Sequence, residues 1–240
     1  MALLGRHTFQ IRPQDCDFTE KVAMPVLGDY VLQTAGKNAD ENGFGMNDLH
    51  RSGRTWVLSR MAIEMKRMPR LNETVTVETW IESIIRIVTT RNFSIMDNAG
   101  EIIGGACSNW AMIDIGSRRS VDLQAINSFG DYATGIPSII EKPEKVTVPE
   151  GKAVEARRVR YSDIDVNCHT NSMKYVEWML DRFPLEWYRT HCIKRLDINF
   201  VHEALYGEEV TVFQQEQDAV SLFEIKKTSG ETACKMKIQW

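Results

Sequence analysis

The first half of the chain combines one helical segment with several segments that have the hydrophobic pattern of strands. Residues from about Val22 to Asn42 support a helix, and Gly43 and Gly45 can end it in the left-handed conformation. Residues 117–132 are expected to add a short helix. Strands are expected at residues 7–12, 54–66, 73–83, 86–97 and 101–114.

The second half shows the same order of elements. Its helix is expected to begin at Thr170, Asn171 or Ser172, any of which can serve as N-cap, and to stop before Pro184. The apolar residues of this helix recur at spacings of three and four: Met173, Val176, Leu180 and Phe183. Strands are expected at residues 153–161 and near 193–203, 208–217, 219–228 and 231–239.

The two halves also match residue by residue. Arg12, Asp15 and Asp17 superpose on Arg160, Asp163 and Asp165 at a constant offset of 148 positions. A second series matches at an offset of 130: Phe93, Ile95, Gly100 and Trp110 with Phe223, Ile225, Gly230 and Trp240. The chain is therefore predicted to be two diverged copies of one unit, a helix followed by antiparallel strands.

This repeat divides the chain into an N-terminal unit at residues 1–135 and a C-terminal unit at residues 153–240. The segment between them, residues 136–152, contains Pro137, Pro143 and Pro149 among several Lys and Glu residues. Such a composition is typical of a linker that crosses the surface.

Composition narrows the class of protein. The chain has 240 residues and a net charge of −4, which gives no indication of nucleic-acid binding. Its five cysteines show neither C-x-x-C spacing nor the density of a disulfide scaffold, so a reducing cytoplasm fits best. The N-terminus lacks the apolar length of a signal peptide, and no apolar run is long enough for a membrane span. We expect a cytoplasmic protein, or one whose targeting segment has been removed.

Potential chemistry is densest in residues 160–178. If the segment is extended, the alternating residues Asp165, Asn167 and His169 all point to one side. The following helix start offers unpaired N–H groups that could stabilise a carbonyl oxygen gaining negative charge. This arrangement suits acyl transfer. The alternative is that the acids and amides are turn and cap residues and that His169 is a surface imidazole.

The pattern of this segment resembles the signature of acyl-acyl-carrier-protein (acyl-ACP) thioesterases, the plant-type enzymes and their bacterial relatives. The matching pattern is Arg160-x-Ser162-Asp163-x-Asp165-x-Asn167-x-His169-x-Asn171-x-x-Lys174-Tyr175-x-x-Trp178. The segment Leu196–Ala204 resembles the family segment in which a catalytic glutamate is followed by a cysteine. Glu203 matches that glutamate, and Ala204 stands in place of the cysteine, which excludes a cysteine nucleophile at this position.

The resemblance implies an α+β fold of the tandem, or double, hot-dog type, in which two long helices are each wrapped by a curved antiparallel sheet. It also implies the catalytic residues Asp165, Asn167, His169 and Glu203. We assign Asp165 as nucleophile or activator of water, His169 as its proton-handling partner and Asn167 as a hydrogen-bonding group. Glu203 would position or deprotonate water. In the first copy Thr19 and Lys21 replace Asn167 and His169, so that copy is expected to be inactive.

The strand pattern alone does not bring Glu203 to the site. Leu196, Ile198 and Phe200 alternate as the buried face of a strand, and strict continuation would turn Glu203 outward. A bulge or the end of the strand near residues 201–203 is required to bring Glu203 to the site.

The inactive first unit is free to form an acyl-chain pocket. Leu27, Trp56 and Met61 are candidate substrate-binding residues, and the favoured alternative for any one of them is an ordinary core residue. A basic rim would attract an acidic carrier protein, and Arg157, Arg158 and Arg160 precede the catalytic loop. Further basic residues flank the first sheet: Arg51, Arg54, Lys66, Arg67 and Arg70.

The resulting expectation is hydrolysis of fatty acyl-ACP, a carrier that holds the chain through phosphopantetheine, with release of free fatty acid and an end to elongation. Two alternatives remain open, an acyl-CoA thioesterase on the same fold and a non-catalytic acyl-binding protein. No cofactor is expected, and the histidines show no metal-ligand spacing. The sequence leaves a homodimer possible.

Overall fold

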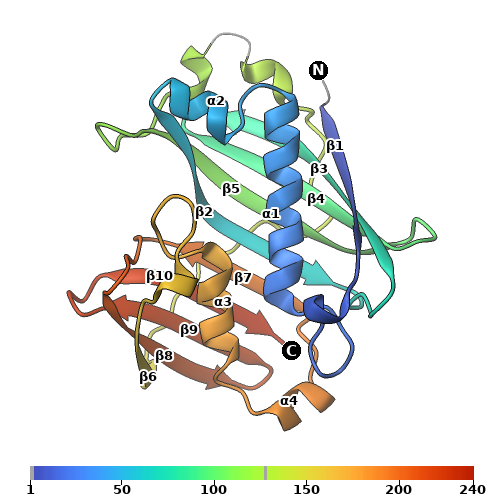
Figure 1. The fold of residues 1–240 in the computed structure, drawn as a ribbon, viewed down its shortest axis with the longest axis vertical. Coiled ribbons are helices and arrows are strands. Elements are labelled where there is room, and N and C mark those ends of the chain that lie inside the picture. Colours follow the sequence, from blue (N-terminus) through green and yellow to red (C-terminus); the bar gives the residue numbers. More distant parts are fainter. Residues whose placement is uncertain (1–2, 127–128) are drawn as a thin grey trace.

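One continuous antiparallel sheet forms the body of the protein, and the helices α1 and α3 pack against the same face of it (Figure 1). The computed structural model describes residues 3–126 and 129–240. The ten strands follow the order β1-β3-β4-β5-β2-β7-β10-β9-β8-β6. The first five come from the first half of the chain and the last five from the second, so two five-stranded units are joined edge to edge.

The first unit contains the longer helix. Its elements are β1 (Leu4–Gln10), η1 (Pro13–Asp15), α1 (Met24–Glu41), α2 (Met46–Arg51), β2 (Arg54–Met65), β3 (Thr74–Ile85), β4 (Val88–Met96), β5 (Ile102–Asp114), η2 (Leu123–Ala125) and η3 (Phe129–Tyr132).

The second unit repeats this order with shorter elements. They are β6 (Lys152–Arg158), η4 (Tyr161–Asp163), α3 (Ser172–Leu180), α4 (Leu185–Thr190), β7 (Arg195–Phe200), β8 (Glu209–Gln217), β9 (Val220–Lys227) and β10 (Thr232–Gln239). The predicted strands are confirmed, with ends that differ by about three residues at most.

Two helix predictions need correction. The helix predicted at residues 117–132 is wrong in extent, because this segment forms only η2 and η3, and residues 127 and 128 lie outside the described part. The second core helix is not long: α3 has nine residues against eighteen in α1. It stops at Leu180 because Pro184 has no N–H to donate to the carbonyl of Leu180, four residues earlier. The hydroxyl of Tyr188 donates to that carbonyl instead, at 2.7 Å.

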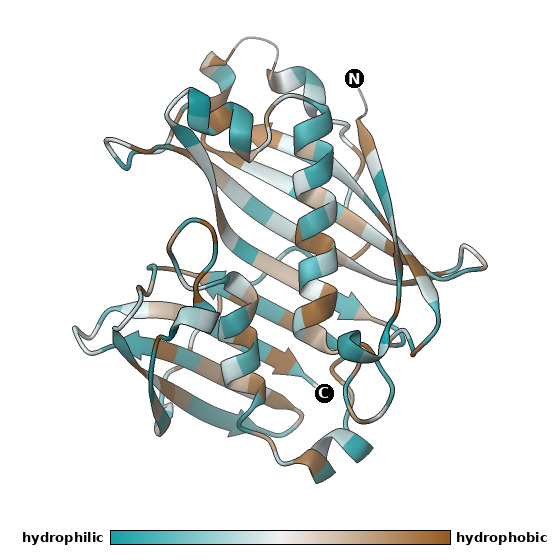
Figure 2. Cartoon of the chain, viewed as in Figure 1, coloured by the Kyte–Doolittle hydropathy of each residue, from teal (hydrophilic) through white to brown (hydrophobic). Residues whose placement is uncertain are grey.

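The two units share one hydrophobic core. Strands β2 and β7 pair across the junction, where Met61 faces Ile198 and Ile63 faces Leu196, all essentially buried. Apolar and polar residues alternate along the strands (Figure 2), and the apolar side faces the helices, which also contact each other. The expected double hot-dog fold is confirmed, with one helix shorter than expected.

The segment between the units is hydrogen-bonded across the sheet face opposite the helices. Asp197 alternates with core residues of β7 and accepts a hydrogen bond from the backbone N–H of Glu144 at 2.9 Å. Asn199, two residues on, bonds to the carbonyl of Glu144 and to the N–H of Val146. Arg195 donates two hydrogen bonds to Asp197, so a buried ion pair lies beneath this segment.

Candidate active site

The loop at residues 164–170 is a tight turn, so the extended conformation that would align Asp165, Asn167 and His169 is not present. The N–H of Asp165 donates to the carbonyl of His169 at 2.9 Å, which closes the turn. Oδ1 of Asp165 accepts the N–H groups of Asn167 at 2.9 Å and His169 at 3.3 Å. Cys168 takes the left-handed conformation with φ 64°. One carboxylate oxygen of Asp165 therefore holds the loop in shape.

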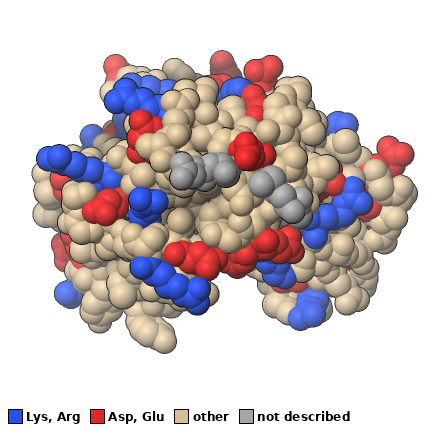
Figure 3. Space-filling model, turned by 90° about the horizontal axis from the view of Figure 1, so that it is seen from above, with Lys and Arg blue, Asp and Glu red and all other residues tan. Residues whose placement is uncertain are grey.

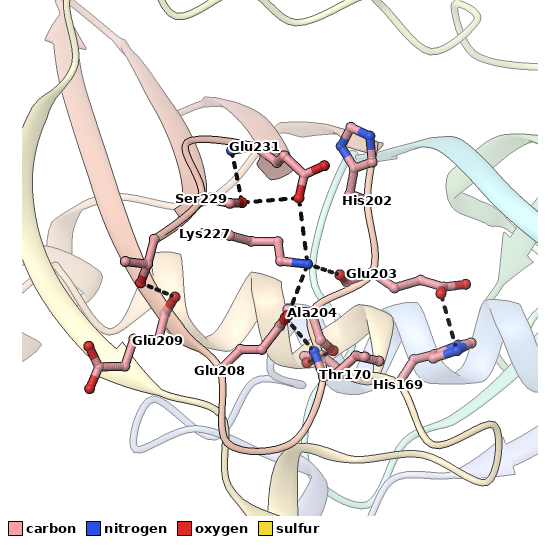
Figure 4. A network of polar contacts seen from close by, with 12 residues as sticks. His169, Thr170, His202, Glu203, Ala204, Glu208, Glu209, Lys227, Ser229 and Glu231 are labelled. Atoms are coloured by element: carbon pink, nitrogen blue, oxygen red, sulfur yellow. Dashed lines mark hydrogen bonds and ion pairs between the residues drawn. The ribbon is translucent and has the colours of Figure 1, made fainter.

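Glu203 faces this loop because the backbone changes direction after β7. The N–H groups of Val201 and His202 both donate to the carbonyl of Ala233, so two residues stand opposite one, as in a β-bulge. The carboxylate of Glu203 then lies 3.2 Å from Nε2 of His169 (Figure 4). The change of direction that the sequence required is present.

Further contacts hold the two segments of the site together. Thr170 donates both its N–H and its hydroxyl to the carbonyl of Ala204, at 3.0 and 2.7 Å. The N–H of Ala204 donates to Oη of Tyr175, and burial raises the pKa of that phenol to about 12. On the other side, Nζ of Lys227 donates to the carbonyl of Glu203 (Figure 4). These hydrogen bonds hold the backbone next to His169 and the backbone at Glu203 in place.

The first unit contributes a residue that sequence reasoning missed. Arg118, in the loop after β5, donates from Nη2 to Oε2 of Glu203 at 2.8 Å. Its own conformation is left-handed, with φ 59°, in a turn where Asp114 accepts hydrogen bonds from the N–H and hydroxyl of Ser117. No periodic pattern marks this loop. The pair of His169 and Glu203 is therefore bounded by a cation from the other unit.

Comparison with known proteins shows the family of this chain. Two family models, the acyl-ACP thioesterase N-terminal and C-terminal domains, match residues 3–125 and 148–240. The chain belongs to the acyl-ACP thioesterase family.

Solved structures agree with this assignment. An acyl-ACP thioesterase from Bacteroides thetaiotaomicron is 38% identical, with a TM-score of 0.93 over 98% of this chain and 97% of that chain. A 12:0-ACP thioesterase from Umbellularia californica has a TM-score of 0.86 at 20% identity, over 100% of this chain and 98% of that one, which shows the same fold.

Curated relatives are longer than this chain. The oleoyl-acyl carrier protein thioesterase 2 of Arabidopsis thaliana is 26% identical over 96% of this chain and 65% of its own length. An acyl-[acyl-carrier-protein] hydrolase of Cuphea viscosissima is 27% identical over 84% of this chain and 51% of its own length. The chain thus spans about half to two thirds of the length of these relatives.

Of the four predicted catalytic residues, only His169 and Glu203 have side chains in direct contact among the described residues. Asp165 is linked to His169 through the backbone, and within the described residues its carboxylate makes no ion pair with the imidazole. Asn167 is exposed at the tip of the turn. The imidazole therefore has Glu203, and not Asp165, as its side-chain partner.

Two of the three candidate substrate-binding residues lie in the interior, and Trp56 is partly buried. Leu27 and Met61 are fully buried in the main core, and the indole N–H of Trp56 donates to the carbonyl of Phe44. A cavity of about 430 Å³ opens elsewhere, between the loop at residues 17–25, the end of α3 and α4.

The expected basic rim is more mixed than the sequence suggests. The guanidinium of Arg157 lies 4.5 Å from the ring centroid of Trp178, and Arg158 donates to the carbonyl of Gly207. Acidic and basic side chains are interspersed over the face seen in Figure 3. Among the described residues, the helices are all too short or too polar to cross a membrane.

Proposed function

We propose that this chain hydrolyses the thioester of fatty acyl-acyl carrier protein and releases free fatty acid, which ends elongation. The observation that carries the proposal is the pairing of His169 with Glu203 at 3.2 Å, in a chain that belongs to the acyl-ACP thioesterase family. An imidazole held by a carboxylate is a group that can take a proton from water.

Hydrolysis of a thioester requires few catalytic groups. Water attacks the thioester carbonyl carbon, its proton passes to the His169–Glu203 pair, and the C–S bond breaks as the tetrahedral intermediate collapses. The leaving thiolate then takes up the proton, so no strong general acid is needed. The amide of Asn167 and the N-terminal end of α3 are the groups we propose for the developing negative charge on the carbonyl oxygen.

Asp165 has two possible contributions. Oδ1 is already used to hold the N–H groups of Asn167 and His169, which is a structural role. The charge of the carboxylate, through Oδ2, is what would let Asp165 help to activate the attacking water. We propose the second role in addition to the first.

The proposed partner is an acyl carrier protein whose phosphopantetheine arm carries the fatty acyl chain. Carrier proteins are acidic, and the exposed Arg158 and Arg160 precede the catalytic loop. Arg157 is a weaker candidate for this contact, because its guanidinium packs over Trp178. All five cysteines are free, which supports a reducing cytoplasm as the location.

The direct test is release of free fatty acid from a panel of acyl-ACPs, run beside the matching acyl-CoAs. We expect turnover of acyl-ACP with kcat/KM above that for acyl-CoA of the same chain length. Higher kcat/KM for acyl-CoA would instead favour the CoA thioesterase, and tight acyl binding without turnover would favour a non-catalytic protein.

A further inference from the structure

The loop after β1 repeats the catalytic loop contact by contact. In the catalytic loop the N–H of Asp165 donates to the carbonyl of His169 at 2.9 Å, and in the first unit Asp17 donates to Lys21 at 2.8 Å. Oδ1 of Asp17 accepts the N–H of Thr19 at 2.7 Å, as Asp165 accepts that of Asn167. The first unit therefore contains the frame of a second site.

The groups that would catalyse hydrolysis are replaced in this frame. The backbone of Lys21 forms an isolated antiparallel β-bridge with Arg70, and the backbone of His169 forms the equivalent β-bridge with Leu205. Met68 precedes Arg70 by two residues, as Glu203 precedes Leu205, so a thioether stands where the carboxylate should be. A lysine and a methionine cannot replace the imidazole–carboxylate pair. The frame in the first unit keeps the turn but lacks this machinery.

The cavity of about 430 Å³ opens beside this frame. Both Lys21 and Met68 line it, and its volume lies within the range of small-molecule sites. In Figure 1, α4 and the loop after β1 lie at the same end of the molecule. Much of the lining is apolar and comes from both units, including Phe18, Leu180, Phe183, Leu185 and Tyr188.

The polar groups of the cavity favour an anionic head. Among the described residues the ammonium group of Lys21 forms no ion pair, and it donates instead to Sγ of Cys192 at 3.3 Å. The nearby carboxylates are already engaged: Glu177 pairs with Lys174 at 2.6 Å. Oδ1 of Asp17 accepts from both the N–H and the hydroxyl of Thr19.

Burial raises the pKa of a third lining carboxylate, Asp181, although the residue remains exposed. Arg189 adds a second cation at the edge, with its guanidinium 5.1 Å from the ring centroid of Phe18. Among the described residues that line the cavity, Lys21 is the one lysine or arginine, and its ammonium group has no carboxylate partner.

We propose that this cavity is a second binding site, which holds a free fatty acid with its carboxylate at Lys21 and its aliphatic chain along the apolar lining. The choice of an aliphatic chain rests on the proposed function, since the frame repeats a site for an acyl chain. The site binds and does not hydrolyse.

Cys192 provides a direct readout, because its thiol is exposed and lines the cavity next to Lys21. The experiment measures the rate of maleimide labelling of Cys192 in the full chain, by peptide mass mapping, with and without laurate below its micelle concentration. We expect laurate to slow labelling of Cys192 saturably, and labelling of Cys168, exposed in the catalytic loop, reports separately on laurate at the active site. Slower labelling of Cys168 alone, or of neither cysteine, would overturn the proposal.

The role of Lys21 is tested by Lys21→Met beside Lys66→Met, which removes an exposed lysine outside the cavity. Lys21→Met should weaken laurate binding about tenfold, the scale of one charge-assisted hydrogen bond, and leave binding of 1-dodecanol unchanged. Equal loss for both ligands, or the same loss in Lys66→Met, would contradict a carboxylate at Lys21.

Hydrolysis of acyl-ACP by the unmodified chain is measured in parallel. Hydrolysis without protection of Cys192 refutes the second site alone. Protection of Cys192 without hydrolysis refutes the proposed function and leaves the second site standing.

Discussion

Arg118 donates a hydrogen bond at 2.8 Å to the carboxylate of Glu203, although the two residues are 85 positions apart and belong to different units. The same carboxylate oxygen, Oε2, lies 3.2 Å from the imidazole of His169. A loop of the first unit therefore completes a site whose other residues all come from the second.

Removal of this cation should lower activity without unfolding the protein. Arg118→Ala leaves Glu203 without its guanidinium partner, and we expect kcat/KM for acyl-ACP to fall about tenfold. The loss is moderate because the side chain of Arg118 is 58% exposed and its ion pair is screened by solvent. The matched control is Arg119→Ala, on the exposed neighbour, and equal losses in the two variants would contradict a specific role.

The two contributions of Asp165 can be separated with two substitutions. Asp165→Asn keeps an oxygen that can accept the N–H groups of Asn167 and His169 but removes the charge, whereas Asp165→Ala removes both. If the charge takes part in the chemistry, both variants should lose about 10²–10⁴ in kcat, as is usual for a positioned acid or base. Full activity in Asp165→Asn with loss in Asp165→Ala would leave only the structural role.

The buried ion pair beneath the inter-unit segment should matter for stability. Arg195→Met leaves the carboxylate of Asp197, which is fully buried, without its cation, and such a loss typically costs about 3–5 kcal/mol. Lys237→Met, which breaks a more exposed pair with Glu144, should cost about 1 kcal/mol or less. Urea denaturation measures the free energy of unfolding of both variants. Similar losses would contradict a larger contribution from the buried pair.

Asp29 should make stability depend on pH. Burial, with a smaller contribution from the nearby Glu177, raises the pKa of Asp29 from 3.8 to about 6. The folded chain then holds the proton more tightly than the unfolded chain. Stability from this group is therefore greatest below about pH 4, falls as the pH rises to about 6, and stays low above that.

The corresponding experiment compares Asp29→Asn with the unmodified chain at pH 4.5 and pH 7.5. The variant should have the higher urea midpoint at pH 7.5 and a smaller advantage at pH 4.5, because asparagine carries no charge to desolvate. Asp131→Asn, at an exposed position, is the control and should leave the midpoint unchanged. An equal advantage at both pH values would rule out the protonation of Asp29 as its cause.

The sequence predicts the fold well because the fold depends on periodicity and on the repeat. The strands and the long helix follow alternating or helical patterns, and the match of Arg12 with Arg160 anticipates that both units have the same frame. The short α3 is harder to predict, since Phe183 continues the helical spacing beyond its end at Leu180.

The site is predicted less completely, for physical reasons. The bulge opposite Ala233 that turns Glu203 toward His169 depends on pairing with a distant strand. Arg118 lies in a loop without periodicity, so only the folded chain brings it to Glu203. Asp197 follows the alternation of β7 and points away from the core helices, yet it is buried because another segment covers it.

The most direct test of the account is the rate of fatty-acid release from acyl-ACP by His169→Ala and Glu203→Gln, measured beside Glu209→Gln, which changes an exposed glutamate nearby. We predict that the first two variants stay folded and lose about 10²–10⁴ in kcat, whereas the control keeps its activity. Near-full activity in folded His169→Ala or Glu203→Gln would contradict the assignment of this pair as the catalytic centre.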